Sequence, residues 1–138
     1  MRHRPHIRYG ICLALMVGAL LPAMPARALD LNDFRRAHHL PPLNMSSALA
    51  FAAELHARDL ARRNHLDHRG FRKRLSPIAS TAAENVLVGC PDEACAIRVW
   101  ARSRGHRRNM LMRGVSAYGI ASATAANGRR YWVLELGN

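Results

Sequence analysis

The sequence is poor in acidic and aromatic residues. It has 9 Asp and Glu residues against 21 Lys and Arg residues, which gives a net charge of +12, and aromatic residues make up 6% of the chain. In a cytosolic protein such an excess of basic residues would suggest nucleic-acid binding. Here the arginines are spread along predicted helices and do not alternate with aromatic residues, so no nucleic-acid partner is expected.

The sequence also lacks an apolar segment of the about 20 residues that span a membrane. The apolar run of residues 11–21 follows three arginines and precedes two prolines and the small-x-small pattern Ala26-Arg27-Ala28. This is the organisation of a secretory signal peptide. We therefore predict a signal peptide over residues 1–28 and an exported domain over residues 29–138, secreted or periplasmic and without a transmembrane segment. An uncleaved N-terminal anchor is the alternative.

Cysteine is scarce, and only Cys90 and Cys95 lie outside the predicted signal peptide. Because disulfides form in exported proteins, this pair is predicted to close a small loop that contributes roughly 2 kcal/mol to stability. A Cys-x4-Cys metal site is the alternative. No second pair of Cys or His residues lies near it in the sequence to complete such a site.

No internal repeat, linker or low-complexity segment interrupts residues 29–138, so we predict one domain. Helices are expected over residues 29–39, 47–63, 71–75, 91–103 and 107–112, and strands over 84–89, 117–123 and 130–136. Asn127-Gly128 predicts a tight hairpin between the last two strands. Helices followed by a hairpin indicate an α+β domain with helices on the faces of a small sheet. Three side chains are expected in its core: His56, Trp100 and Trp132.

Two histidines and a carboxylate stand out as candidate site residues. His106 follows a glycine at the junction of two predicted helices, His68 lies in the polar loop 64–70, and Glu84 begins a predicted strand. Two imidazoles and a carboxylate are the usual ligands of zinc and the usual parts of an acid–base site. The sequence alone does not show whether the three side chains meet.

The order of these features resembles the CAP superfamily, the SCP-like domains of cysteine-rich secretory proteins, antigen 5 and plant pathogenesis-related proteins, especially its short bacterial branch. The motifs that carry the resemblance are Phe34-Arg35, Leu43, Leu49, His56-Ala57-Arg58-Asp59, His68, Glu84-Asn85, Trp100, Ser103-Arg104-Gly105-His106-Arg107, Asn109, Tyr118-Gly119-Ile120 and Tyr131-Trp132. They extend over nearly all of residues 29–138. The resemblance implies a three-layer α–β–α sandwich with a small, mainly antiparallel sheet and a central cleft.

In that family the cleft holds a tetrad of two histidines and two glutamates. By position, His68, Glu84 and His106 match three of the four, and Ser103 stands where the second glutamate is expected. A serine cannot supply a carboxylate. The resemblance therefore does not carry over a mechanism that needs both acids.

The matching residues allow three interpretations of the site. They form a hydrogen-bonded structural cluster, or His68 and His106 bind zinc or another divalent metal weakly, or such a metal works with Glu84 as a catalytic base. His65, three residues before His68, could supplement it as a ligand. Ser103 is better explained as a helix-end residue than as a nucleophile.

The leading hypothesis is an exported binding module, rather than an enzyme, which holds a small apolar or anionic ligand, a lipid or a cell-envelope polymer in or beside the cleft. A metal-dependent hydrolase with zinc on His68 and His106 and with Glu84 as base is the alternative. A third hypothesis is an envelope protein recruited by charge, because removing four leader arginines lowers the net charge only from +12 to +8. Arg104, Arg107 and Arg108 could bind an anion or simply be solvated. We expect a monomer.

Overall fold

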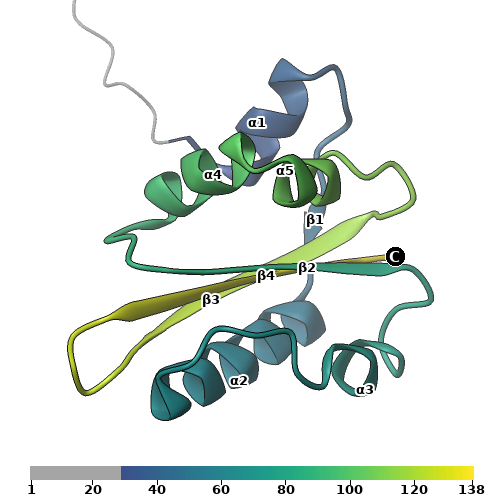
Figure 1. Cartoon of the computed structure of the whole chain (residues 1–138). Coiled ribbons are helices and arrows are strands. Elements are labelled where there is room, and N and C mark those ends of the chain that lie inside the picture. The colour runs from purple at the N-terminus through teal and green to yellow at the C-terminus, as the bar shows by residue number, and fades with distance from the viewer. Residues whose placement is uncertain (1–28) are drawn as a thin grey trace, which may run out of the picture.

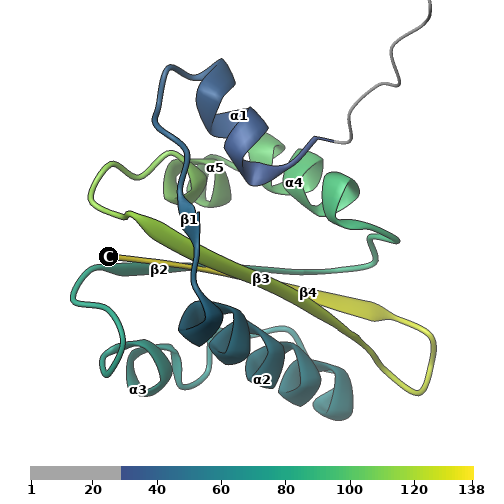
Figure 2. The same cartoon turned by 180° about the vertical axis from the view of Figure 1, so that it is seen from behind.

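The sheet of this protein lies between two layers of helices, which Figures 1 and 2 show from opposite sides. The computed structural model describes residues 29–138, and the predicted signal peptide lies outside the described residues. One helical layer contains α1 (Leu31–Ala37), α4 (Glu93–Arg102) and α5 (Arg104–Met110), and the other contains α2 (Ser47–Arg63) and α3 (Phe71–Leu75). The α–β–α sandwich expected from the sequence is confirmed.

Four strands form the sheet in the order β1–β3–β4–β2. They are β1 (Asn44–Met45), β2 (Ala82–Val88), β3 (Ala117–Thr124) and β4 (Arg130–Gly137). The β3–β4 and β2–β4 pairs are antiparallel, and the short β1 runs parallel to β3. The sheet is therefore mainly antiparallel, as expected, and β4 is a central strand whose residues after Arg130 are all buried.

The hairpin predicted from Asn127-Gly128 is present between β3 and β4, and its loop spans residues 125–129. Gly128 adopts a φ of 80°, a conformation that favours glycine. Asn127 Oδ1 accepts a hydrogen bond from the backbone N–H of Arg129 at 3.1 Å. The turn chemistry of Asn-Gly thus fixes the pairing of the last two strands.

Some element boundaries differ from those predicted. Helix α4 begins at Glu93 instead of Pro91, because Asp92 is its N-cap and accepts the backbone N–H of Cys95 at 2.8 Å. Helix α5 begins at Arg104, three residues earlier than expected, and α1 is shorter at both ends than residues 29–39. Strand β1 was not predicted, because two residues show no periodicity and the strand exists only through its pairing with β3.

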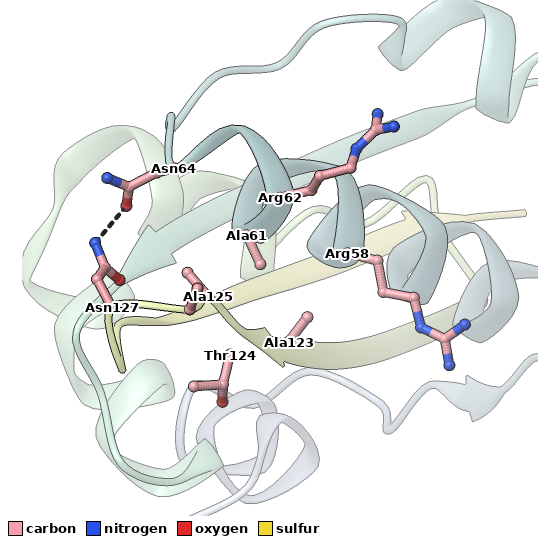
Figure 3. Close-up of a pocket in the computed structure, with 9 residues that line it drawn as sticks. Arg58, Ala61, Arg62, Asn64, Ala123, Thr124, Ala125 and Asn127 are labelled. Carbon is pink, nitrogen blue, oxygen red and sulfur yellow. Dashed lines mark hydrogen bonds between the residues drawn. The ribbon is translucent and has the colours of Figure 1, made fainter.

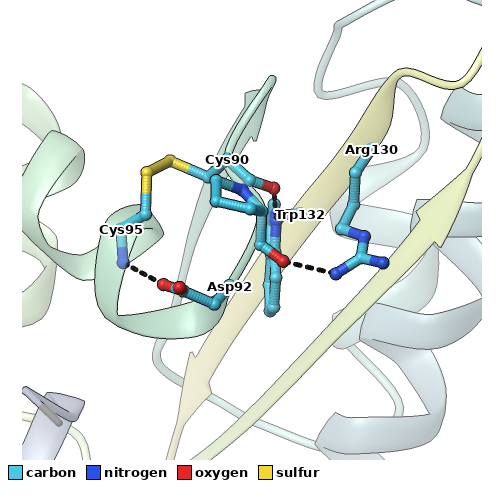
Figure 4. Close-up of a disulfide and its surroundings, with 6 residues drawn as sticks. Cys90, Asp92, Cys95, Arg130 and Trp132 are labelled. Atoms are coloured by element: carbon cyan, nitrogen blue, oxygen red, sulfur yellow. Dashed lines mark hydrogen bonds between the residues drawn. A yellow bond between two sulfur atoms is a disulfide. The ribbon is translucent and has the colours of Figure 1, made fainter.

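The Cys90–Cys95 disulfide predicted from the sequence is present and is shown in Figure 4; its two Cα atoms are 5.5 Å apart. It closes the connection between β2 and α4. Trp132 of β4 donates its indole N–H to the Cys90 carbonyl oxygen at 2.9 Å. Trp132 and Trp100 are both buried, so their expected place in the core is confirmed.

Arg35 of α1 is a buried charge that holds α5 in place. Its guanidinium donates to the carbonyl oxygens of Pro41 at 3.0 Å, Met110 at 2.8 Å and Met112 at 3.0 Å. Two of these carbonyls lie at the C-terminal end of α5, where a positive charge is favourable. Arg35 thereby fixes the helix that carries His106. Among residues 29–138, no helix is long and apolar enough to cross a membrane.

Helix α2 and strand β3 approach each other most closely at Gly119. A Cβ atom at Gly119 would lie 2.0 Å from the backbone nitrogen of Ala50 in the first turn of α2. The backbone N–H of Ser46, the N-cap of α2, donates to the Tyr118 carbonyl oxygen at 2.8 Å. Glycine is therefore required at this position, because the start of α2 is fastened directly to the strand.

We expect Gly119→Ala to lower the free energy of unfolding by about 3 kcal/mol, because the added methyl group must push α2 off the sheet. The measurement is urea-induced unfolding followed by circular dichroism. Gly105→Ala is the matched control, since a Cβ atom at Gly105 would meet no atom within 4 Å. Equal unfolding midpoints for the two variants would contradict the close approach.

Candidate functional site

His68, in the loop after α2, and Glu84 of β2 are in contact. His68 Nδ1 lies 2.6 Å from Glu84 Oε1, and the two side chains are 55% and 1% exposed. Because a carboxylate only accepts hydrogen bonds, the imidazole donates through Nδ1–H. This bond fixes the ring and its tautomer, and it leaves Nε2 as the atom that can bind a ligand.

Arg74 of α3 is the second partner of the Glu84 side chain. Its Nη2 donates to Glu84 Oε2, and its Nη1 donates to the Arg69 carbonyl oxygen next to His68. Both carboxylate oxygens of Glu84 are thus engaged. The sequence does not single out Arg74, because it is one of three consecutive basic residues in a short helix and nothing local distinguishes it from a surface charge.

Glu135 of β4 lies directly across the sheet from Glu84. The two residues are paired in the β2–β4 register, Glu135 is fully buried, and its Oε1 lies 3.5 Å from Arg74 Nε. Burial, and then the hydrogen bond to Glu84 and the charge of Glu84, raise the pKa of Glu135 to about 9. The motifs of the sequence do not single out Glu135 either. A carboxylate inside the apolar run 131–136 was the available signal.

His56 on α2 completes the buried surroundings of Glu84. Its Nε2 lies 3.0 Å from the Asp67 carbonyl oxygen, to which it donates, and 3.8 Å from Glu84 Oε2. This confirms the expectation of a core histidine bonded to the backbone. Burial lowers the pKa of His56, although the charge of Glu84 acts in the opposite direction. His56 therefore anchors the loop that carries His68.

Helix α5, which carries His106, is fastened to β2 by two amides. Asn109 Nδ2 donates to the Glu84 carbonyl oxygen at 3.2 Å and to Asn85 Oδ1 at 2.9 Å. Asn85 Nδ2 donates to the His106 carbonyl oxygen at 3.0 Å. Burial, and then the charge of His68, lower the pKa of His106. The two imidazoles therefore lie within range of each other's charge.

Ser103 lies at the junction of α4 and α5. Its backbone N–H donates to the Trp100 carbonyl oxygen at 3.1 Å, and its hydroxyl does not cap α5. The residue is a helix-end position, as the sequence suggested. No carboxylate enters the site from this junction.

A pocket of about 310 Å³ opens beside the His68–Glu84 pair. Three polar side chains line it, His68, Glu84 and Asn109. The other lining residues are Phe71, Ala82, Ala83 and Met112. A pocket with apolar walls and a few polar groups is the usual form of a small-molecule site.

The sequence proposes the imidazoles of His68 and His106 as donors for a metal ion, and of the two only His68 lines the pocket. In the part of the chain that the structure describes, no group of three or more His, Cys, Asp or Glu side chains is arranged to hold a metal ion. Glu84 would have to release His68 or Arg74 to become a third ligand. His68 and His106 are therefore the residues that would hold a divalent metal, and two ligands bind weakly.

The model of the cysteine-rich secretory protein family, CAP, matches residues 30–136. This chain belongs to the CAP family. The protein YkwD of Bacillus subtilis strain 168 is 26% identical to it over 97 residues, which cover 64% of this chain and 38% of YkwD. The chain thus spans little more than a third of this curated relative.

Solved structures share the fold of this CAP domain at low sequence identity. An outer surface protein from Borrelia burgdorferi matches with a TM-score of 0.70 and 16% identity, over 78% of this chain and 86% of that one. An extracellular protein containing an SCP domain from Bacillus anthracis matches with a TM-score of 0.68 and 23% identity, over 78% of this chain and 37% of that one. These likenesses show the fold.

A second and larger pocket of this CAP domain, of about 550 Å³, lies between α2 and the β3–β4 hairpin. Figure 3 shows Ala61, Ala123 and Ala125 there, with the arginines on the α2 side. Arg58 and Arg62 are each paired with a carboxylate of their own helix. Among the described residues that line this pocket there is no histidine, aspartate or glutamate.

We expect Asn109→Ala to lower the free energy of unfolding by about 1–3 kcal/mol, because it removes two hydrogen bonds and leaves Asn85 Oδ1 without its donor. Urea unfolding measures the change. Arg108→Ala, on the exposed face of the same helix, is the control and should change stability by less than about 0.5 kcal/mol. If both variants unfold at the same urea concentration, the amide does not fasten α5 to β2.

The lowered pKa of His56 predicts a pH dependence of stability. The unfolded chain takes up a proton on this imidazole near pH ~6.5, whereas the folded protein resists protonation. The free energy of unfolding contributed by this group is therefore full at neutral pH and falls as the pH drops below ~6.5. Between pH 7 and pH 5, the stability of wild type should fall relative to His56→Gln. His65→Gln, at an exposed imidazole, should follow wild type; parallel curves for all three proteins would contradict the prediction.

Proposed function

We propose that this CAP domain is an exported binding module whose pocket beside His68 receives the polar end of a small ligand. The His68–Glu84 hydrogen bond is the observation that carries the proposal. It holds a half-exposed imidazole in one orientation at the edge of a pocket with apolar walls. A side chain that is already fixed loses little conformational entropy when a ligand binds.

The dimensions and walls of the pocket favour a small amphiphilic ligand. A volume of about 310 Å³ lies at the lower end of the range for ligand sites, so it suits a small molecule or the end of a lipid or cell-envelope polymer. Phe71 and Met112 would contact the apolar part. An anionic head fits the basic balance of the chain, 21 Lys and Arg against 9 Asp and Glu, and would meet His68 Nε2.

The basic segment around His106 contributes less to such a site than its sequence suggests. Arg107 lies over the Phe34 ring at 5.4 Å and its Nη2 donates to His38 Nε2 at 2.8 Å. It therefore belongs to the contact between α1 and α5. Arg104 and Arg108 are exposed and are the members of this segment that could approach an anion.

A weakly held divalent metal, such as zinc, is a second ligand that we propose for the same histidines. His68 Nε2 and an imidazole nitrogen of His106 would hold it, and its charge would attract an anionic head. The contact between a carboxylate and the other ring nitrogen of His68 is the arrangement that orients metal-binding histidines. Two imidazoles without a third protein ligand support only weak binding.

Binding fits the geometry better than hydrolysis does. As a general base, Glu84 would need an oxygen that can take a proton from water in the pocket. Its two oxygens are instead engaged by His68 and Arg74, and its side chain is 1% exposed. We therefore propose that Glu84 orients His68, and we keep the metal-dependent hydrolase as the alternative to be tested.

Export rests on the family and on the predicted signal peptide. The family is described as secretory, and the Bacillus anthracis structure is of an extracellular protein. We propose that this protein is likewise secreted or periplasmic. Its ligand would then be a molecule found outside the cytoplasm.

Titration calorimetry with zinc chloride tests the metal. We expect weak binding by wild type that is lost in the His68→Ala, His106→Ala double variant, because these imidazoles are the ligands that we propose. His65→Ala is the control and should bind as wild type does. Binding that survives in the double variant would place the metal elsewhere.

The same titration with octanoate, a small amphiphile with an anionic head, tests the binding module against the hydrolase. Octanoate binding that is lost in His68→Ala but survives in Glu84→Gln supports the module. Hydrolysis of a p-nitrophenyl ester by wild type that disappears in Glu84→Gln would overturn it in favour of the hydrolase. No octanoate binding by wild type would show that the pocket does not take a ligand of this class.

A further inference from the structure

We propose that Glu135 is the second acid of this site and that it acts as a positioning residue. It carries a proton, which it donates in a hydrogen bond to Glu84. Glu84 is thereby kept as the single negative charge that orients His68. The inference concerns the chain's own side chains and does not depend on which ligand the pocket binds. Three observations support it: the place of Glu135 in the sheet, the charges of the cluster, and the hydrogen bonds of the two acids.

The sheet brings the two acids together and leaves room for them. Glu135 is paired with Glu84 on one side and with Gly119 on the other. Gly119 has no side chain, so β3 presents no polar group to Glu135. From the helical layer, Arg74 of α3 contacts both acids, and His56 of α2 lies 3.8 Å from Glu84. With His68, whose Nδ1 lies 2.6 Å from Glu84 Oε1, these are the titratable groups around the pair.

With His56 and His68 as neutral imidazoles, the charges of this cluster balance when one of the two acids is protonated. Arg74 supplies one positive charge, and two ionised carboxylates would leave a net negative charge in a site where both side chains are almost fully buried. An uncompensated buried charge is strongly unfavourable. Two buried carboxyl groups that contact the same arginine share one proton for the same reason.

Hydrogen bonding decides which acid holds the proton. Glu84 accepts from His68 Nδ1 and from Arg74 Nη2, two donors that favour its ionised form. As an acceptor, Glu135 has the longer contacts of 3.5 Å from Arg74 through Oε1, and its Oε2 receives no hydrogen bond from the described residues. Glu135 is therefore the proton carrier. Burial and its hydrogen bond to Glu84 raise its pKa accordingly.

In this arrangement Glu135 of β4 supplies the second carboxyl group of the site. Ser103, at the end of α4, has no carboxyl group to supply. The proton held by Glu135 neutralises the second carboxyl group without a second arginine. Glu84 then accepts hydrogen bonds from Glu135, Arg74 and His68 together. Loss of the proton from Glu135 would place two negative charges beside Arg74 and weaken the hold of Arg74 on Glu84.

Carbon-13 NMR of protein labelled at the glutamate side-chain carboxyl tests the inference directly. The spectra are recorded from pH 4 to pH 10, with a chelator present so that metal ions play no part. We expect one carboxyl signal to titrate near pH 9 and to be absent in Glu135→Gln. A second signal, assigned through Glu84→Gln, should shift in the same step. If the Glu135 signal titrates near its ordinary value of ~4.5, the inference is wrong.

The stability of Glu135→Gln provides a second test, because an amide mimics the protonated acid but cannot ionise. The unfolded chain loses the Glu135 proton near pH ~4.5, whereas the folded protein keeps it until about pH 9. The stability of wild type should therefore fall relative to Glu135→Gln as the pH rises through this window. Glu54→Gln, at a surface carboxylate paired with Arg58, is the control and should not show this trend.

Parallel stability curves for wild type and Glu135→Gln would overturn the inference, because they would mean that Glu135 does not carry a proton in the folded state. If Glu135→Gln does not fold, the wild-type carboxyl titration decides by itself. A folded Glu135→Gln variant in which the pH-9 step persists would assign that step to another group, and that outcome would also overturn the inference.

Discussion

A buried carboxylate is strongly unfavourable unless hydrogen-bond donors or a positive charge lie beside it. In this protein the contacts that stabilise Glu84 set the arrangement of the site. Its side-chain oxygens accept from His68 and Arg74, and its backbone carbonyl accepts from Asn109. The donors come from the loop after α2, from α3 and from α5. Segments of both helical layers thus contact β2, and the pocket lies where they meet.

The bonds that satisfy Glu84 also limit what the site can do. An imidazole held by a buried carboxylate is well suited to receive a polar group or a metal ion. A carboxylate with both oxygens engaged is poorly suited to remove a proton from water. The protonated Glu135 that we infer would hold Glu84 in this ionised, fully bonded state, since it lets two acids share a buried site with one arginine. Recognition is therefore the function that we propose.

The structural relatives show how little of this follows from the fold. Two solved structures share the backbone arrangement at 16% and 23% identity, which means that the sandwich tolerates wide changes of sequence. Function is set by the side chains placed on such a scaffold. In this chain those side chains include Ser103, Arg74 and Glu135. No local motif indicates the role of the last two.

The sequence by itself determined the elements of this protein apart from the short β1, and much of its site. Helical spacing marked α2 and its buried His56, Asn127-Gly128 marked the hairpin, and the spacing of Cys90 and Cys95 marked the disulfide, because each of these depends on neighbours in the chain. Only the tertiary structure decided what surrounds Glu84. Arg74 reaches Glu84 from a separate short helix, and Glu135 faces Glu84 through a strand register that spans 51 positions of sequence, from 84 to 135. Such pairings form only when the strands and helices pack together. The sequence could therefore propose His68 and His106, but not the charged residues Arg74 and Glu135 beside Glu84.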